Sequence, residues 1–238
     1  NYSWDNKTME TGVEDNYGTN NWPDARLNYL LNPGYKSETI GGSLYWNRNS
    51  GTCYSGGNNS TTSCDFTSTG LTYTAKAMIG DAKWYLGTPD SSTGSSNVLA
   101  SHYYKNERGT AVYNSYNGRR NTNWTGEVGL MYPSDYGYAT SGGSSTNRAS
   151  CITKLGNWSD NSYSDCKNND WLLNTSTTQW TMSPSHYASY IVLGIPTLGY
   201  FGNYSADTTN ATRPVVHLKS TIKITGGIGS STVPFILG

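Results

Sequence analysis

The four cysteines are the residues whose type and spacing point most clearly to a chemistry in this 238-residue sequence. Cys53 and Cys64 enclose the polar segment YSGGNNSTTS, and Cys151 and Cys166 enclose ITKLGNWSDNSYSD. Four cysteines allow three disulfide pairings, and we expect the sequential one because each enclosed segment is short and rich in turn residues. Closing loops of roughly 11–15 residues stabilises a fold by about 3 kcal/mol in the chain-entropy model.

A zinc site is the alternative use of these cysteines. Zinc ligands usually follow C-x2-4-C spacing or include nearby histidines, whereas His102, His186 and His217 are far apart in the sequence. Disulfides form in oxidising compartments. We therefore expect an extracellular or cell-surface protein, and the absence of an initiator Met or signal peptide before Asn1 indicates a processed chain or a fragment.

Side chains with oxygen atoms are frequent between residues 160 and 170, within and just after the second cysteine segment. They are Asp160, Asp165, Asn168 and Asp170. Hard cations such as Ca²⁺ favour oxygen ligands, so calcium is the metal that these side chains suggest. The alternative is an Asx-rich turn in which these side chains bond to their own backbone. The Glu-Pro-Asn, Gln-Pro-Asp and Trp-Asn-Asp tripeptides of a calcium-dependent lectin are absent.

Aromatic residues are the strongest candidates for ligand or interface contacts. Tyr and Trp stand in polar, Ser-, Gly- and Asn-rich surroundings, a combination found in antibody paratopes, and aromatic faces also suit sugar rings. Our candidates are Tyr45, Trp46, Trp158 and Tyr163. The alternative is that a chain poor in aliphatic residues builds its core from Tyr and Trp.

Catalytic patterns are weak throughout. A nucleophile elbow of the G-x-S-x-G type is absent. His186 and His217 are more often packed or exposed histidines than bases, and the five Glu show no evident carboxylate pair. We therefore expect no enzymatic activity, and an enzyme of unknown reaction stays the least favoured reading.

The composition excludes several classes of protein. Ser, Thr, Asn and Gly make up 112 of the residues, and 16 Lys and Arg balance 16 Asp and Glu. Nucleic-acid binders need a basic surplus, which is missing here. A membrane helix needs about 20 consecutive apolar residues, and no stretch approaches that length. Low charge with 13% aromatic residues also differs from a disordered chain.

The chain divides into a part with helices and a part with strands. Helices are expected over 22–31, 74–79, 98–108 with Asn97 as its cap, and 133–139, whereas 41–70 is expected to be a loop region. Strands are expected over 82–86, 127–132, 179–182, 189–193, 198–201, 214–218 and 221–225, with a further apolar run at 171–173. Arg213 precedes a central strand, where a charge needs a partner, and Asp135 is our candidate; the alternative is an arginine that faces solvent.

Five segments taken in order resemble a known pattern. They are NWPDARLNYLLN (21–32), AMIGDAKWYLG (77–87), WTGEVGLMYPSDYGYAT (124–140), DWLL…QWTMSP (170–184) and TRPVVHLKSTIKITGGIGSS (212–231). The set resembles an uncharacterised bacterial extracellular domain family of the formylglycine-generating-enzyme-like, C-type-lectin-like fold group. The resemblance implies an α+β C-type-lectin-like fold with a small twisted antiparallel sheet, two or three short helices and long disulfide-stapled loops.

The resemblance also implies a link to pilins, because similar chains often carry a prepilin-type leader helix. No such leader precedes Asn1, and Val233, Phe235, Ile236 and Leu237 replace the polar ending of the family. This apolar tail must be buried somewhere. We expect one domain over 1–238 whose termini, 1–9 and 232–238, form contacts between subunits.

Two functions therefore stand ahead of the enzyme reading. The first is the globular part of a pilin-like or filament subunit, with a structural and adhesive role and identical subunits as partners. The second is a monomeric lectin-like module that binds a glycan or a host-surface protein. Neither requires a cofactor, apart from the calcium considered above.

Overall fold

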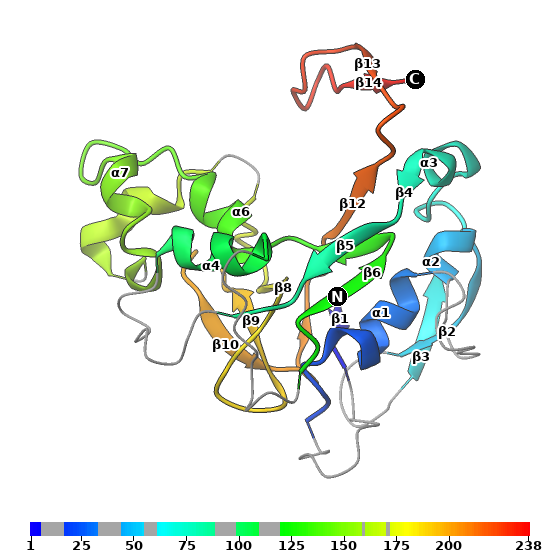
Figure 1. Cartoon of the computed structure of the whole chain (residues 1–238), viewed down its shortest axis with the longest axis horizontal. Helices are drawn as coiled ribbons and strands as arrows, with labels where there is room; N and C mark the ends of the chain where they lie inside the picture. Colours follow the sequence, from blue (N-terminus) through cyan, green and yellow to red (C-terminus); the bar gives the residue numbers. More distant parts are fainter. Residues whose placement is uncertain are drawn as a thin grey trace.

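The computed structural model describes residues 1–5, 17–32, 44–54, 61–88, 99–109, 120–158, 160–169 and 172–238, which form short helices and short strands, with strands alone from β8 onwards (Figure 1). The helices are η1 (Trp22–Asp24), α1 (Arg26–Leu31), α2 (Leu44–Asn47), α3 (Tyr73–Met78), α4 (Ala100–Glu107), α6 (Pro133–Tyr138), α7 (Arg148–Cys151), η4 (Leu155–Asn157) and η5 (Asn161–Lys167). The strands are β1 (Tyr2–Ser3), β2 (Ser50–Tyr54), β3 (Thr61–Asp65), β4 (Ile79–Gly80), β5 (Ala82–Tyr85), β6 (Asn123–Gly126), β7 (Val128–Leu130), β8 (Gln179–Pro184), β9 (Ile191–Ile195), β10 (Gly202–Ser205), β11 (Thr209–Asn210), β12 (Pro214–Leu218), β13 (Ile224–Gly226) and β14 (Ile236–Leu237).

The strands are divided among small antiparallel sheets. β9 lies between β8 and β10, and β12 lies between β4 and β7, while the other strands pair as β1–β11, β2–β3, β5–β6 and β13–β14. The predicted mixture of helices with antiparallel strands is confirmed. The resemblance implied one small sheet, whereas the described residues form several, because glycine, asparagine and proline interrupt the strands after a few residues.

Both disulfides have the predicted sequential pairing. Cys53–Cys64 joins β2 to β3, and Cys151–Cys166 joins α7 to η5. The prediction of a loop region over 41–70 is wrong for its described part, which holds α2 and the β2–β3 hairpin. Threonine supplies part of the reason, since β-branched side chains favour strands even in a polar segment.

The core consists of two clusters of buried side chains. Trp4, Trp22, Trp84 and Trp180 anchor the first, together with leucines and valines of α1 and β7. The second surrounds Tyr136 and Trp158 and includes residues of α4, η4 and β9. The half-buried Val215 of β12 packs against both clusters, so the central strand connects them. A single domain over the whole chain stays a prediction.

Most predicted elements lie where the sequence placed them. The 22–31 helix appears as η1 followed by α1, and α3, α4, α6, β5, β7, β8, β9 and β12 overlap their predicted ranges. Gly109, which follows the C-cap Arg108 of α4, has φ +70°, as expected of a glycine just past a helix end. Asn97, its predicted cap, and Trp171 lie outside the described residues.

The strand predicted over 198–201 is wrong. Gly199 N–H donates to the Pro196 carbonyl (2.8 Å), and Gly199 has φ +81°, so these residues form a turn and β10 begins only at Gly202. The apolar run at Leu172 and Leu173 is also outside any strand. Apolar character alone does not distinguish a strand from a packed turn.

Candidate functional site

The chain ends in a hairpin that stands away from the rest of the molecule (Figure 1). We call residues 222–238 the C-terminal hairpin. β13 pairs with β14, and Lys223 and Gly238 exchange two backbone hydrogen bonds (2.9 and 3.1 Å). Among the described residues, no hydrogen bond joins 223–238 to the rest of the chain. The hairpin is therefore held together by its own contacts.

A glycine-rich turn closes the C-terminal hairpin. Gly227 and Gly229 have φ near +80° (80° and 78°), a conformation that other residues rarely adopt. The N–H groups of Ile228 and Gly229 both donate to the Val233 carbonyl (3.2 and 3.1 Å). The Phe235 ring covers Gly229 so closely that a Cβ atom there would lie 2.4 Å from the ring.

The C-terminal hairpin exposes an unusual amount of apolar surface. Its exposed side chains are Ile224 (60%), Ile228 (74%), Val233 (47%), Phe235 (52%) and Ile236 (61%). An isolated two-stranded hairpin is only marginally stable in water, and contiguous exposed apolar patches commonly mark interaction sites. These observations make the C-terminal hairpin the candidate functional site.

The structure brings the predicted assembly residues together in this hairpin. Val233, Phe235 and Ile236 are exposed, and Leu237 is half-buried on β14. Ile224 and Ile228, on the opposite side of the turn, were not among the predicted assembly residues. The Gly-Gly pair at 226–227, between two apolar segments, was a hairpin signal that could have identified them.

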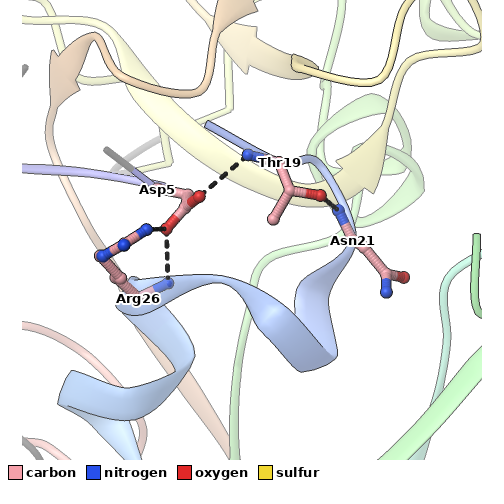
Figure 2. Close-up of polar contacts among 4 residues, drawn as sticks. All are labelled: Asp5, Thr19, Asn21 and Arg26. Atoms are coloured by element: carbon pink, nitrogen blue, oxygen red, sulfur yellow. Dashed lines mark hydrogen bonds and ion pairs between the residues drawn. The ribbon is translucent and has the colours of Figure 1, made fainter. Parts of the chain in front are cut away.

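Ser3, Trp4 and Asp5 of the predicted N-terminal interface are buried in their own chain and Tyr2 is half-buried, and a subunit contact through residues 1–9 stays a prediction. Residues 6–9 lie outside the described residues. β1 pairs with β11, and Trp4 and Asp5 are fully buried. Figure 2 shows the reason at Asp5, whose carboxylate accepts hydrogen bonds from the Thr19 N–H (2.9 Å), the Arg26 N–H (3.1 Å) and Arg26 Nη1 (2.6 Å).

This network secures the beginning of α1. Thr19 Oγ1 also accepts a hydrogen bond from the Asn21 N–H (3.1 Å), so the turn before η1 is fixed (Figure 2). Burial raises the pKa of Asp5 to about 6, although the Arg26 charge and the hydrogen bonds act in the opposite direction. Asp5 is therefore ionised and paired at neutral pH.

The four predicted contact aromatics do not gather into one surface. Tyr45 and Trp46 of α2 are half-buried against the first core cluster, where the Tyr45 ring lies 5.5 Å from that of Phe66. Tyr163 is half-buried against the second cluster. Their role in ligand binding or in an interface stays a prediction.

Trp158 is not a surface residue, and its assignment as a contact aromatic is wrong. Its side chain is fully buried, its ring lies 5.4 Å from that of Tyr136, and its Nε1 donates to the Cys151 carbonyl (3.0 Å). The indole fills the space beside the second disulfide. Core formation by aromatic residues, the alternative raised from composition, therefore accounts for it.

The oxygen-bearing side chains proposed for calcium bond to backbone groups. Asp160 accepts from the Ser162 N–H (2.8 Å), Asp165 accepts from the Thr146 N–H (3.1 Å), and Asn168 Nδ2 donates to the Gly142 carbonyl (3.1 Å). Asp170 lies outside the described residues. Within the described ranges, no three His, Cys, Asp or Glu side chains gather as metal ligands. The calcium site stays a prediction.

The predicted pair of Arg213 and Asp135 is replaced by other partners. Arg213 Nη1 donates to the Leu172 carbonyl (3.0 Å), while the half-exposed Asp135 lies 3.8 Å from Arg108 Nη2. Asp135 Oδ2 also accepts from the Tyr132 N–H (3.1 Å), which fixes the start of α6. The predicted pairing of Asp135 with Arg213 is therefore wrong, and Asp135 lies near Arg108 instead.

A buried carboxyl lies beside this pair. Glu107, at the end of α4, is 2% exposed and accepts hydrogen bonds from the Ser134 N–H (3.1 Å) and the Ser134 hydroxyl. Burial raises the pKa of Glu107 to about 8, although these hydrogen bonds act in the opposite direction. Because both oxygens contact the buried Ser134, the carboxyl links two helices and does not face a ligand.

Comparisons with known proteins give no relatives. No family model matches the chain, and no curated protein or solved structure shows significant similarity to it. Within the described residues, no helix has the length and apolar character needed to cross a membrane.

Proposed function

We propose that this chain is a non-enzymatic extracellular surface protein of C-type-lectin-like fold, the globular part of a pilin-like or filament subunit with a structural and adhesive role. Its C-terminal hairpin would contact a neighbouring, identical subunit. The exposed apolar side chains of that hairpin are the observation that carries the proposal.

Burial of exposed apolar surface would drive the contact between subunits. Burying apolar surface contributes roughly 25 cal/mol per Å², and five large apolar side chains of the C-terminal hairpin are about half exposed or more. This favourable free energy is not obtained while the side chains of the hairpin are exposed to water. A neighbouring subunit that covers it would also stabilise the hairpin, because a two-stranded sheet needs a packing partner.

The disulfides also support the proposal, because they fit a location outside the cell. Two disulfides and the absence of a membrane-spanning helix among the described residues fit a secreted or extracellular protein. The buried side chains also give the body a core of its own, so the hairpin is available for an external contact.

The test uses electron microscopy and sedimentation of the full chain. Natively isolated protein is expected to form regular filaments, and the double variant Phe235→Ser/Ile236→Ser is expected to sediment as a folded monomer with unchanged near-ultraviolet circular dichroism. The matched control is Tyr73→Ser, because Tyr73 is 84% exposed and far from the hairpin in sequence. Dispersed wild-type monomers at all concentrations would overturn the proposal and favour a monomeric binding module.

A further inference from the structure

The second hairpin of the structure offers an open strand edge. β2 and β3 pair through five residues each, from Ser50↔Asp65 to Tyr54↔Thr61. Helices α1 and α2 pack against β2, and the Leu44 side chain lies against Gly51. No backbone group of β3 has a hydrogen-bond partner beyond β2 within the described residues. β3 is therefore an edge strand with free donors and acceptors.

Native proteins usually block such edges with charges, proline or a covering segment. β3 has the sequence TTSCD, in which only Asp65 is charged and four of the five side chains are exposed. A shallow hollow of about 420 Å³ lies over the hairpin and is lined by Ser50, Gly51, Thr52, Ser63, Cys64 and Asp65. The small lining side chains leave room there for a large apolar one.

The C-terminal hairpin has the complementary properties. The outer edge of β13 is likewise without backbone partners among the described residues, and β13 contains no proline. β14 is less suitable because Pro234, two residues before it, lacks an N–H. β13 also presents Ile224, 60% exposed, as a side chain that could enter the hollow.

The charges of the two hairpins have opposite sign. Lys223 is the one charged side chain of residues 222–238, and Asp65 is the one charged side chain of β2 and β3. Hydrogen bonds from Thr67 lower the pKa of Asp65, so it is ionised at neutral pH. Arg48 donates to the carbonyls of Thr67 and Ser68 instead of pairing with Asp65.

We propose that β13 of one copy of this chain adds to the free edge of β3 of a second copy, which places Lys223 near Asp65 and Ile224 over the hollow. This inference rests on the proposed function and names the acceptor surface. Strand addition at an open edge is a common mode of recognition, in which backbone hydrogen bonds supply the affinity.

The contact would join different surfaces of the two copies. Figure 1 shows the C-terminal hairpin above the body and β2–β3 at its side, so the same patch is not used twice. A head-to-tail contact of this kind propagates into an open filament unless the rotation closes a ring. Each subunit would then donate one hairpin and accept one.

The first experiment exchanges the two charges in the full chain. Asp65→Lys and Lys223→Asp are each expected to raise the concentration needed for assembly by about three- to tenfold, because like charges then face each other. The double variant is expected to recover most of the wild-type value. Asp81→Lys with Lys154→Asp is the matched control, since both residues are exposed.

A capping experiment tests the direction of the contact. A chain lacking residues 222–238 keeps β3 but has no β13, so small amounts added to wild-type protein are expected to shorten the filaments. The same deletion combined with Asp65→Lys is expected to lose this effect. Should the deletion prevent folding, Lys223→Asp replaces it as the capping chain.

The outcomes separate the two proposals. Wild-type filaments with unaltered assembly in both charge variants would overturn the β3 acceptor and leave the proposed function standing. Two negative results together would also overturn the β3 acceptor and leave the proposed function standing. These are a double charge variant that does not recover assembly and a truncated chain that does not shorten the filaments. Absence of any wild-type assembly would overturn the proposed function itself.

Discussion

Glu107 and Ser134 join α4 to α6 through two hydrogen bonds, from the Ser134 N–H (3.1 Å) and the Ser134 hydroxyl to the two carboxyl oxygens. The carboxyl is almost completely buried. This arrangement leaves Glu107 protonated at neutral pH, because its pKa is raised to about 8 by burial. Protonation of one buried group therefore contributes to the packing of two helices.

The pH dependence of stability follows from this raised pKa. The folded chain holds a proton on Glu107 between about pH 4.5 and 8 that the unfolded chain has lost, so stability falls as the pH rises through that window. Between pH 6.5 and 9, which lies above the pKa of Asp5, the free energy of unfolding of the wild type, measured with urea, is expected to decrease by a few kcal/mol as the pH rises. Glu107→Gln should flatten the profile, and an equally steep profile in this variant would contradict the assignment.

Replacing Asp5 removes the charge paired with Arg26 in the interior. Asp5→Asn is expected to lower the free energy of unfolding at pH 7 by about 3–5 kcal/mol, the range found when one partner of a buried ion pair is removed. Asp81→Asn, on an exposed aspartate, is the control and should change it by less than about 0.5 kcal/mol. Equal effects in equilibrium urea unfolding would argue against the network at Asp5.

Trp158 distinguishes a core role from a ligand role. Trp158→Ala removes a fully buried side chain and should cost about 3–5 kcal/mol. Tyr187→Ala, at a residue that is 59% exposed, serves as the comparison and should leave the melting temperature almost unchanged. A stable Trp158→Ala protein with lost glycan binding would restore the original surface assignment.

The two disulfides are expected to contribute similarly. They close segments with sequence separations of 11 and 15 residues, and loop-closure entropy predicts about 3 kcal/mol for each. Paired Cys→Ser variants of one bridge at a time are to be measured by thermal unfolding. Loss of Cys53–Cys64 should additionally weaken assembly if β3 is the acceptor strand, whereas loss of Cys151–Cys166 should affect stability alone.

Local signals in the sequence predicted the helices and the disulfides well. Pro23 and Asp24 marked η1, and the spacing of Leu27, Leu30 and Leu31 marked α1, since these signals depend only on residues a few positions apart. The cysteine pairing was predictable for the same reason. Strand boundaries near residue 200 were not, because Pro196 and Gly199 form a turn within an apolar run.

Long-range packing is what the sequence could not reveal. Trp158 stands among Asn, Ser and Asp residues, and only its contacts with Tyr136 and the Cys151 carbonyl show that it is core. The partner of Arg213 was likewise undetermined, since Leu172 is 41 residues away. The apolar tail was recognisable from Val233, Phe235, Ile236 and Leu237, but its exposure and its pairing with β13 were not predictable from the sequence.

The pairing of β1 with β11 determines when the chain can finish folding. Tyr2 faces Asn210, and the Tyr2 carbonyl accepts from Trp180 Nε1 (2.9 Å) across 178 residues. Ribosomes add about 5–20 residues per second, so the first strand waits on the order of ten seconds or more for its partner. During that interval the fully buried Trp4 has no completed core to enter. Because β1 pairs only with a strand near residue 210, the last long-range contact of the fold cannot form until most of the chain has been synthesised.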